Sequence, residues 1–208
     1  MKKAIFIDKD GTLIPDIPYN ADPGLIVLED KVIEGLKKLL VEDYLYIIIS
    51  NQSGLAHGFF SEDDLAAVEH HIGQLLLQDS LKLDGFYFCP HYPGACVKKY
   101  DANCYCRKPM PGLILKAAAD FDIDLSQSWM IGDILNDVEA GNRAGTRTIL
   151  INNGNETEWL LNTDERNPTF IAKNMEEAAD FILQSLHPEQ SSFFLNSQLK
   201  FGKVSSGI

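Results

Sequence analysis

The sequence predicts an α/β protein built on a mostly parallel sheet with helices on both faces. Short apolar runs alternate with amphipathic stretches along the 208 residues, the pattern of strands joined by helical crossovers. The apolar runs show little alternation with polar residues, as expected of strands buried on both faces. Polar residues follow several of these runs, at the sheet edge where open α/β proteins bind ligands. We expect one domain over 1–186 and a tail over 187–208.

The expected strands are short apolar runs, several of them rich in β-branched residues. They cover 4–8, 46–50, 84–88, 129–133 and 148–152, with a short edge strand at 170–172. The first run follows two lysines, as in a signal peptide, but it stops at Asp8 and is too short for one. We therefore interpret it as a strand.

The expected helices carry apolar residues at intervals of three and four. They cover 32–40, 61–78, 111–121, a segment around 137–145, and 175–186. The second is the clearest, because Ser61 and Asp64 form a capping pair ahead of an apolar stripe. The tail over 187–208 is rich in serine, and we assign it no function.

The composition narrows the classes of function. The chain has 30 acidic residues against 18 lysines and arginines, a formal net charge of −12. Proteins that bind nucleic acid usually present a basic face, so we expect no nucleic-acid partner. No stretch approaches the roughly 20 apolar residues of a membrane span, so we expect no membrane partner. We also expect the protein to be cytoplasmic and monomeric. A small anionic substrate needs only a few local cations.

Four polar stretches lie at, or lead into, the carboxyl ends of the expected strands. They are DKDGT (8–12), SNQSG (50–54), RKP (107–109) and GDILND (132–137). Asp8 and Asp10 can face one site only if the chain turns sharply, which Gly11 permits. Converging carboxylates repel one another unless a divalent cation is present, and oxygen ligands suit Mg²⁺. With Lys108 and the hydroxyl and amide donors of 50–51, they predict a phosphoryl-transfer site.

Each stretch taken alone has a simpler interpretation. Aspartate, serine, asparagine and glycine after a strand are ordinary turn residues. A basic pair before proline is usual in a solvated loop, and Asn136 with Asp137 can cap a helix. Only the joint arrangement of all four stretches favours catalysis.

All four cysteines lie in the loop over 89–106. The loop offers five potential metal ligands, and tetrahedral Zn²⁺ takes four: Cys89, His91, Cys96, Cys104 and Cys106. Clustered cytosolic cysteines more often hold metal than form disulfides, so we favour zinc over disulfides and over a chance cluster of reduced thiols. Four protein ligands leave no open position, so the expected zinc is structural.

The four stretches, in this order on this strand pattern, resemble the motifs of the haloacid dehalogenase (HAD) superfamily. The loop CPHYPGACVKKYDANCYCRKP (89–109) is similar to that of the branch containing heptose 1,7-bisphosphate phosphatases and histidinol-phosphate phosphatases. The resemblance runs over residues 4–185. It implies a HAD-like, Rossmannoid three-layer sandwich with a zinc-stapled loop insertion and no large cap domain.

The resemblance also implies a role for each matched residue. Asp8 would attack phosphorus to form an aspartyl-phosphate, and Asp10 would act as general acid and base. Mg²⁺ would sit on the Asp8 carboxylate, the Asp10 backbone carbonyl and the Asp133 carboxylate. Ser50 and Lys108 would hold the transferring phosphoryl group.

Other matched residues would support these groups. Asp137 would orient Lys108 or a metal-bound water. The substrate would contact Gly11, Thr12, Tyr19, Asn51, Gln52 and Arg107. The zinc ligands would be Cys89, His91, Cys104 and Cys106, which leaves Cys96 as a free thiol. Zinc would close the loop and fix its exit at Arg107 and Lys108.

Three positions depart from the heptose bisphosphate pattern: Ile14 replaces an asparagine, His57 an arginine and Ile134 a lysine or arginine. The lost cations weaken the case for a second phosphate on the substrate. We expect a Mg²⁺-dependent phosphomonoester hydrolase that removes the 7-phosphate of D-glycero-D-manno-heptose 1,7-bisphosphate. Histidinol phosphate or another small sugar phosphate is the alternative.

Two other classes of function remain. One is a non-catalytic domain that binds a phosphorylated ligand, against which the intact Asp8 and Asp10 argue. The other is a nucleic-acid 3′-end phosphatase, which the net charge disfavours.

Overall fold

The computed structural model of the chain describes residues 1–187. Within them, six strands form one sheet in the order β3-β2-β1-β4-β5-β6, and all neighbours are parallel. The strands are β1 (Ala4–Ile7), β2 (Leu45–Asn51), β3 (Gly85–Cys89), β4 (Trp129–Gly132), β5 (Arg147–Ile151) and β6 (Phe170–Ala172). Each lies within one residue of a predicted strand at either end, and β6 is at an edge as predicted.

Six α-helices accompany the sheet in the same residues. They are α1 (Val32–Leu39), α2 (Gly54–His57), α3 (Glu62–Gln78), α4 (Gly112–Phe121), α5 (Leu135–Ala144) and α6 (Met175–Leu186). The prediction missed α2, because one turn is too short to show a periodic pattern. The expected capping pair is present, since Ser61 Oγ accepts from Asp64 N and the Asp64 carboxylate accepts from Ser61 N.

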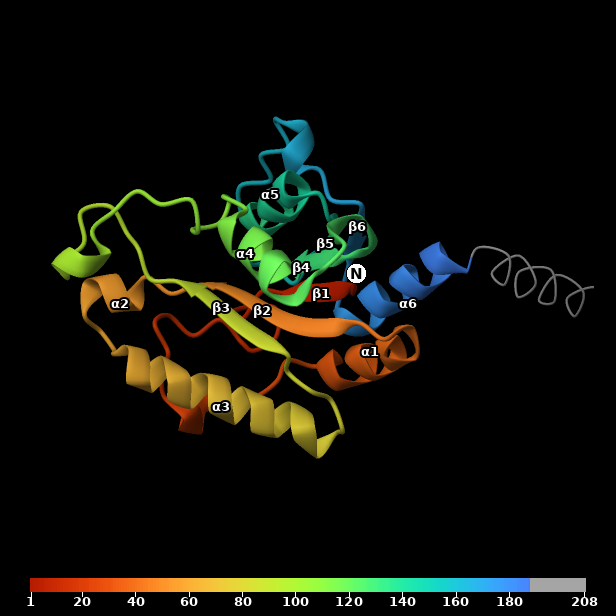
Figure 1. The fold of residues 1–208 in the computed structure, drawn as a ribbon, viewed down its shortest axis with the longest axis horizontal. Coiled ribbons are helices and arrows are strands. Elements are labelled where there is room, and N and C mark those ends of the chain that lie inside the picture. Colours follow the sequence, from red (N-terminus) through yellow and green to blue (C-terminus); the bar gives the residue numbers. More distant parts are fainter. Residues whose placement is uncertain (188–208) are drawn as a thin grey trace, which may run out of the picture.

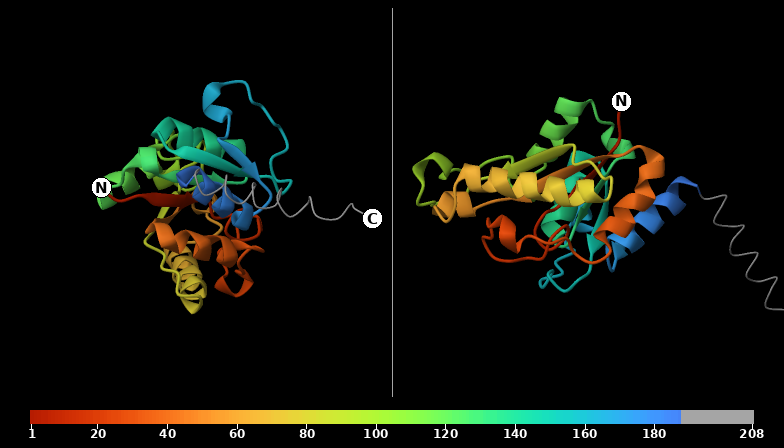
Figure 2. Two further views of the ribbon diagram at one scale, coloured as in Figure 1. Left: turned by 90° about the vertical axis from the view of Figure 1, so that its right-hand side faces the viewer. Right: turned by 90° about the horizontal axis from the view of Figure 1, so that it is seen from below.

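Helices cover both faces of the sheet and make three layers (Figure 1). Along β1 the side chains alternate, so Ile5 and Ile7 pack on one side and Ala4 and Phe6 on the other. The first side is covered by α1, α3 and α6, and the second by α4 and α5. Helices α1 and α6 lie side by side in Figure 2, although five of the six strands separate them in sequence. Burial on both faces explains the continuous apolar runs.

The strand register brings three chain segments together at the carboxyl edge of the sheet. Ile7 pairs with Ile48 of β2 and with Ile131 of β4. The residues that follow β1 begin at Asp8, and those that follow β4 begin at Asp133. These two segments therefore lie at neighbouring positions, next to the end of β2. The long loop from β3 to α4 projects beside α2 at this end (Figure 1), where Val97 N donates to the Ala56 carbonyl at 3.0 Å.

The segments that join the strands at this edge are loops and short helices. Residues 1–187 hold no large cap domain, as predicted. No helix in that range is long and apolar enough to cross a membrane. The tail over 188–208 lies outside the described residues.

Candidate active site

Asp8, the first residue after β1, lies in a buried charged cluster. Its backbone N donates to the Ile131 carbonyl at 2.9 Å, which extends the β1–β4 pairing by one residue. Lys108 Nζ contacts the Asp8 carboxylate, lies 2.6 Å from Asp137 Oδ1 and donates to the Ile49 carbonyl at 2.9 Å. The lysine is thus fixed between two carboxylates and the end of β2.

Burial of this cluster shifts its proton equilibria. Burial raises the pKa of Asp8 well above its ordinary value; Lys108 acts in the opposite direction, and Asp137 and Asp133 add to the rise. Burial alone would lower the pKa of Lys108, but Asp137 and Asp8 outweigh it and raise that pKa. Burial, and then Asp137, raise the pKa of Asp133 to about 6. Three carboxylates around one lysine leave negative charge that a cation would neutralise.

The donor set fits Mg²⁺. Carboxylate oxygens of Asp8, Asp133 and Asp137 lie within 4.8 Å of one another. Asp133 is held in place by Thr12 Oγ1, which donates to Oδ1 at 3.1 Å, and by Asn155 Nδ2, which donates to Oδ2 at 2.8 Å. Buried oxygen donors with excess negative charge are the environment this ion prefers. The expected contribution of the Asp10 carbonyl stays a prediction.

A sharp turn after Asp8 presents Asp10 to the same site. Gly11 has a φ of +87°, and a Cβ there would collide with the Asp133 carboxylate, so the position needs glycine. Gly11 N donates to the Ile14 carbonyl at 2.7 Å, and Ile14 is buried in the core. Asp10 Oδ1 lies 2.6 Å from Lys9 Nζ. The turn therefore directs both aspartates of DKDGT toward one end of the sheet.

The end of β2 fixes the loop that carries Lys108. Asn51 Nδ2 donates to the Lys108 carbonyl at 3.1 Å, and Lys108 N donates to Asn51 Oδ1 at 3.0 Å. Gln52 Nε2 donates to Ser50 Oγ at 2.8 Å and to Asp10 Oδ2 at 2.9 Å. Thus Asn51 holds the lysine's backbone, while Gln52 joins Ser50 to Asp10. The substrate contacts expected of these residues stay predictions.

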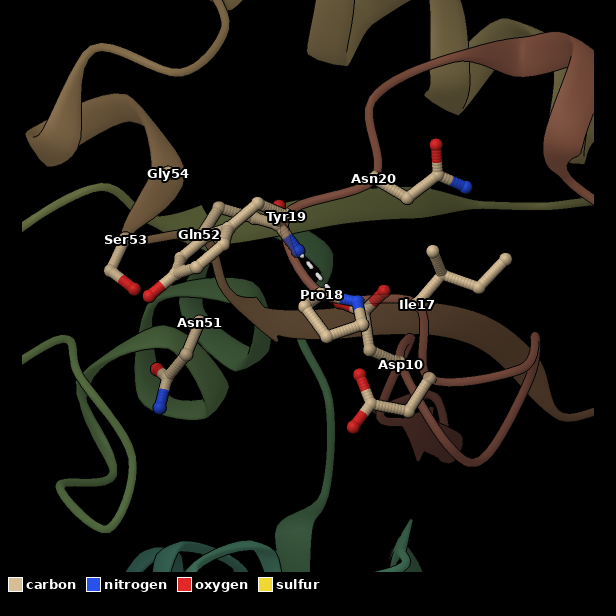
Figure 3. A pocket seen from close by; sticks show the side chains of 10 residues that line it. Asp10, Ile17, Pro18, Tyr19, Asn20, Asn51, Gln52, Ser53 and Gly54 are labelled. Atoms are coloured by element: carbon tan, nitrogen blue, oxygen red, sulfur yellow. Dashed lines mark hydrogen bonds between the residues drawn. The ribbon is translucent and has the colours of Figure 1, made fainter.

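A pocket of about 280 Å³ opens in front of Asp10 (Figure 3). Its other lining residues come from the segment after β1 and from the end of β2: Asp16, Ile17, Pro18, Tyr19, Asn20, Asn51, Gln52, Ser53 and Gly54. Most of these side chains are polar, which suits a ligand with hydroxyl groups. Asp10 lines this pocket and lies close enough to Asp8 for its charge to raise the pKa of Asp8, so the pocket adjoins the buried cluster.

A row of rings continues outward from this pocket. The ring of Tyr19 lies 4.7 Å from that of Phe59 and 5.9 Å from that of His57, between ring centroids. His57 in turn lies 4.9 Å from Tyr92, and the Arg107 guanidinium lies over the Tyr92 ring at 5.4 Å. His57 therefore packs among aromatic rings, and Arg107 is placed at the far end of the row.

The cysteine loop brings together the four ligands implied by the resemblance. Cys89 Sγ lies 3.4 Å from Cys104 Sγ and 3.1 Å from Cys106 Sγ, and His91 Nδ1 lies 3.3 Å from Cys106 Sγ. One ligand atom from each residue lies within 4.8 Å of the others. The exposed Cys96 stays outside this group. Three thiols and one imidazole fit tetrahedral Zn²⁺, with no position left for water.

Three residues near the site were missed by the sequence reasoning. Lys9 is fully buried beside Asp10, Asn155 bonds to Asp133, and Asn153 Nδ2 donates to the Gly11 carbonyl at 2.6 Å. A signal existed for the two asparagines, because the polar run NNGN follows β5 at the carboxyl edge of the sheet. Nothing in the sequence distinguished Lys9 from a solvated lysine.

Comparisons with known proteins agree with this geometry. A family profile described as "HAD-hyrolase-like" matches residues 105–178. D-glycero-beta-D-manno-heptose-1,7-bisphosphate 7-phosphatase of Pasteurella multocida is 35% identical over 187 residues, 89% of this chain and 94% of that protein. The protein of that name from Escherichia coli K12 is 33% identical and covers 84% of this chain and 96% of its own.

A solved structure gives a similar result. The D,D-heptose 1.7-bisphosphate phosphatase from B. bronchiseptica, complexed with magnesium and phosphate, matches with a TM-score of 0.71 at 27% identity. The match covers 88% of this chain and 99% of that one.

Proposed function

The chain belongs to the HAD-like phosphatases, and from this membership we propose that it hydrolyses a small sugar phosphate through a covalent intermediate on Asp8. The observation that carries the proposal is the buried Asp8 carboxylate beside Lys108, with Asp10 in the lining of the adjacent pocket. A nucleophile, a cation and a proton donor at one strand end are the parts that phosphoryl transfer requires.

The proposed reaction has two steps. The Asp8 carboxylate attacks phosphorus, the ester P–O bond breaks, and the Asp10 carboxyl gives its proton to the leaving oxygen. A water then attacks the aspartyl-phosphate; Asp10 takes its proton, and inorganic phosphate and the Asp8 carboxylate are released. Lys108 and Ser50 hold the phosphoryl oxygens, and Asp137 holds Lys108. Asp8 and Asp133 would hold Mg²⁺, which would neutralise the charge of the phosphate near these carboxylates.

We propose the 7-phosphate of D-glycero-D-manno-heptose 1,7-bisphosphate as the group removed. The proposal is supported by relatives of that name at 33–37% identity, and by a pocket rim rich in hydroxyl and amide groups. Tyr19, Asn51, Gln52 and Arg107 would contact the sugar. Gly11 and Thr12 would form part of the phosphate site. They are held in place because Gly11 N donates to the Ile14 carbonyl and Thr12 Oγ1 donates to Asp133.

One observation favours a second substrate. The row of Tyr19, His57, Phe59 and Tyr92 consists of aromatic rings in edge-to-face and tilted contact with one another, whereas a second phosphate would need cations. Arg107, which we propose to contact substrate, lies at the end of this row. A monophosphate with a flat or apolar remainder, such as histidinol phosphate, fits such a surface better than a bisphosphate does.

Phosphate release with Mg²⁺ tests the proposal across a panel. The panel holds both anomers of heptose 1,7-bisphosphate, histidinol phosphate, hexose phosphates and a 3′-phosphorylated oligonucleotide, with Asp8→Asn as the blank. We expect the highest kcat/KM with one heptose anomer. Preference for a monophosphate would replace the substrate but keep the reaction. Release from no compound would contradict the proposed function.

A further inference from the structure

We propose that Lys9 and Gln52 are positioning residues that hold the Asp10 carboxyl group in the orientation needed to protonate the leaving oxygen. The inference rests on the proposed function, because it takes Asp10 as the general acid. It concerns a residue, Lys9, that lies between the two aspartates of DKDGT but has no surface toward the pocket.

Lys9 is in an unusual place for a charged side chain. Its side chain is 0% exposed, and Asp10 Oδ1, at 2.6 Å, is its one salt-bridge partner within residues 1–187. Removing an ammonium group from water carries a large desolvation cost, and one ion pair in the interior seldom does more than offset it. A contribution to stability is therefore a poor explanation for this lysine. A directional role at Asp10 explains it better.

Gln52 holds the other oxygen of the same carboxyl group. Its Nε2 donates to Asp10 Oδ2 at 2.9 Å, the bond marked in Figure 3, and to Ser50 Oγ at 2.8 Å. Gln52 is itself fixed, because it is buried and its backbone N donates to the Cys89 carbonyl at 2.8 Å. The two oxygens of Asp10 are thus held from two different strand ends.

This double contact leaves Asp10 little rotational freedom. Its side chain is 26% exposed and lines the pocket, while Lys9 and Gln52 bind one oxygen each and so fix the plane of the carboxyl group. A general acid acts only within hydrogen-bonding reach of the atom it protonates, so a freely rotating carboxyl group would spend most of its time misplaced. Without Lys9 or Gln52, protonation of the leaving oxygen should slow, and so should the later step in which Asp10 takes a proton from water, while the carboxylate of Asp8 is unchanged.

The dependence on the leaving group separates this role from a structural one. An alkoxide must receive a proton as the P–O bond breaks, whereas p-nitrophenolate leaves without one. Lys9→Met keeps the length of the side chain and carries the kinetic test, because Gln52 is also proposed to contact the sugar. The measure is kcat/KM, which covers the steps up to departure of the leaving group and leaves out the later hydrolysis step that also uses Asp10. We expect Lys9→Met to lose about 10²-fold in kcat/KM on the best alkyl phosphate of the panel, the low end of a general-acid contribution, and under about threefold on p-nitrophenyl phosphate.

The matched control is Lys82→Met, which removes a lysine that pairs with Asp84 at 2.7 Å on the surface. It should change neither rate. Equal losses of kcat/KM on both substrates in Lys9→Met, or no loss on either, would overturn the proposal.

Crystal structures keep the two hypotheses apart. If the wild-type protein hydrolyses no alkyl phosphate, the proposed function fails, and the orientation of Asp10 in the Lys9→Met crystal structure decides the inference. A rotated or disordered carboxyl group supports the positioning role. An Asp10 side chain that keeps its wild-type orientation, with Gln52 also substituted, overturns it.

Discussion

Replacing Asp133 by asparagine should stabilise the protein in Mg²⁺-free buffer and destabilise it, relative to wild type, when Mg²⁺ is present. Asp133 is 3% exposed and shares its surroundings with Asp8 and Asp137. Folding raises its pKa from 3.8 to about 6. A carboxyl whose pKa rises on folding favours the folded state below the unfolded value, and that advantage is lost as the pH rises through the folded value.

The magnitude follows from this shift. About two pKa units at roughly 1.4 kcal/mol each give a penalty of about 3 kcal/mol for the ionised carboxylate at pH 8. The substitution removes that penalty but weakens the bonds from Thr12 and Asn155, which costs about 1 kcal/mol each. We therefore expect a net gain of about 1 kcal/mol in Mg²⁺-free buffer. At a Mg²⁺ concentration of about 100 times Kd, wild type gains about 2.7 kcal/mol and the variant nothing, which reverses the order.

The assay is urea denaturation at pH 8, after dialysis against Mg²⁺-free buffer and again with Mg²⁺ added. The exposed carboxylate of Asp30 supplies the control, since Asp30→Asn should leave the free energy of unfolding unchanged under both conditions. The advantage of Asp133→Asn should shrink as the pH falls below about 6, because the wild-type carboxyl then holds its proton. A variant that is less stable in Mg²⁺-free buffer, or one that Mg²⁺ stabilises as much as wild type, would refute the reasoning.

Three further predictions concern separate parts of the molecule. Cys104→Ser should lower the zinc content measured by atomic absorption and reduce turnover about tenfold, while Cys96→Ser should do neither; full turnover in a zinc-free variant would contradict the supporting role of the loop. Ile134→Lys should raise the kcat/KM ratio of bisphosphate over monophosphate about fivefold to tenfold, because it adds a cation beside Asp133, and an unchanged ratio would count against a second phosphate site there. Ser61→Ala should lower the free energy of unfolding by about 1 kcal/mol with no change in kcat, because it removes the cap of α3; a loss of activity would show that this cap matters to the site.

The family and the fold were predictable from local sequence. The four polar stretches and the cysteine loop are short motifs, so their order along the chain was enough to indicate the HAD-like relatives later found. The strands were predictable because burial on both faces requires nearly continuous apolar runs, as in Ile47, Ile48 and Ile49. The short helix α2 was not, because one turn leaves no periodic signal.

Side-chain contacts between distant segments depended on the tertiary structure. The sequence predicted that Asp8, Asp10, Lys108 and Asp133 belong to one site. DKDGT and GDILND stand at strand ends, and RKP ends the loop that follows the third strand. The sequence could not determine that Lys9 turns inward to Asp10, or that Asn155 reaches Asp133.

The physical reason is that local sequence encodes which residues are apolar and where the chain turns, whereas the parallel register decides which loops meet. Asp8 and Lys108 are 100 residues apart in sequence. They make contact because β2 pairs with β1, and Ile49 and Asn51 of β2 bond to Lys108. Whether a charged side chain is buried against a partner or left in water is likewise settled only after the strands have packed. The sequence therefore determined which family the chain resembles and which residues its motifs contribute, and the tertiary structure decided which groups hold those residues in place.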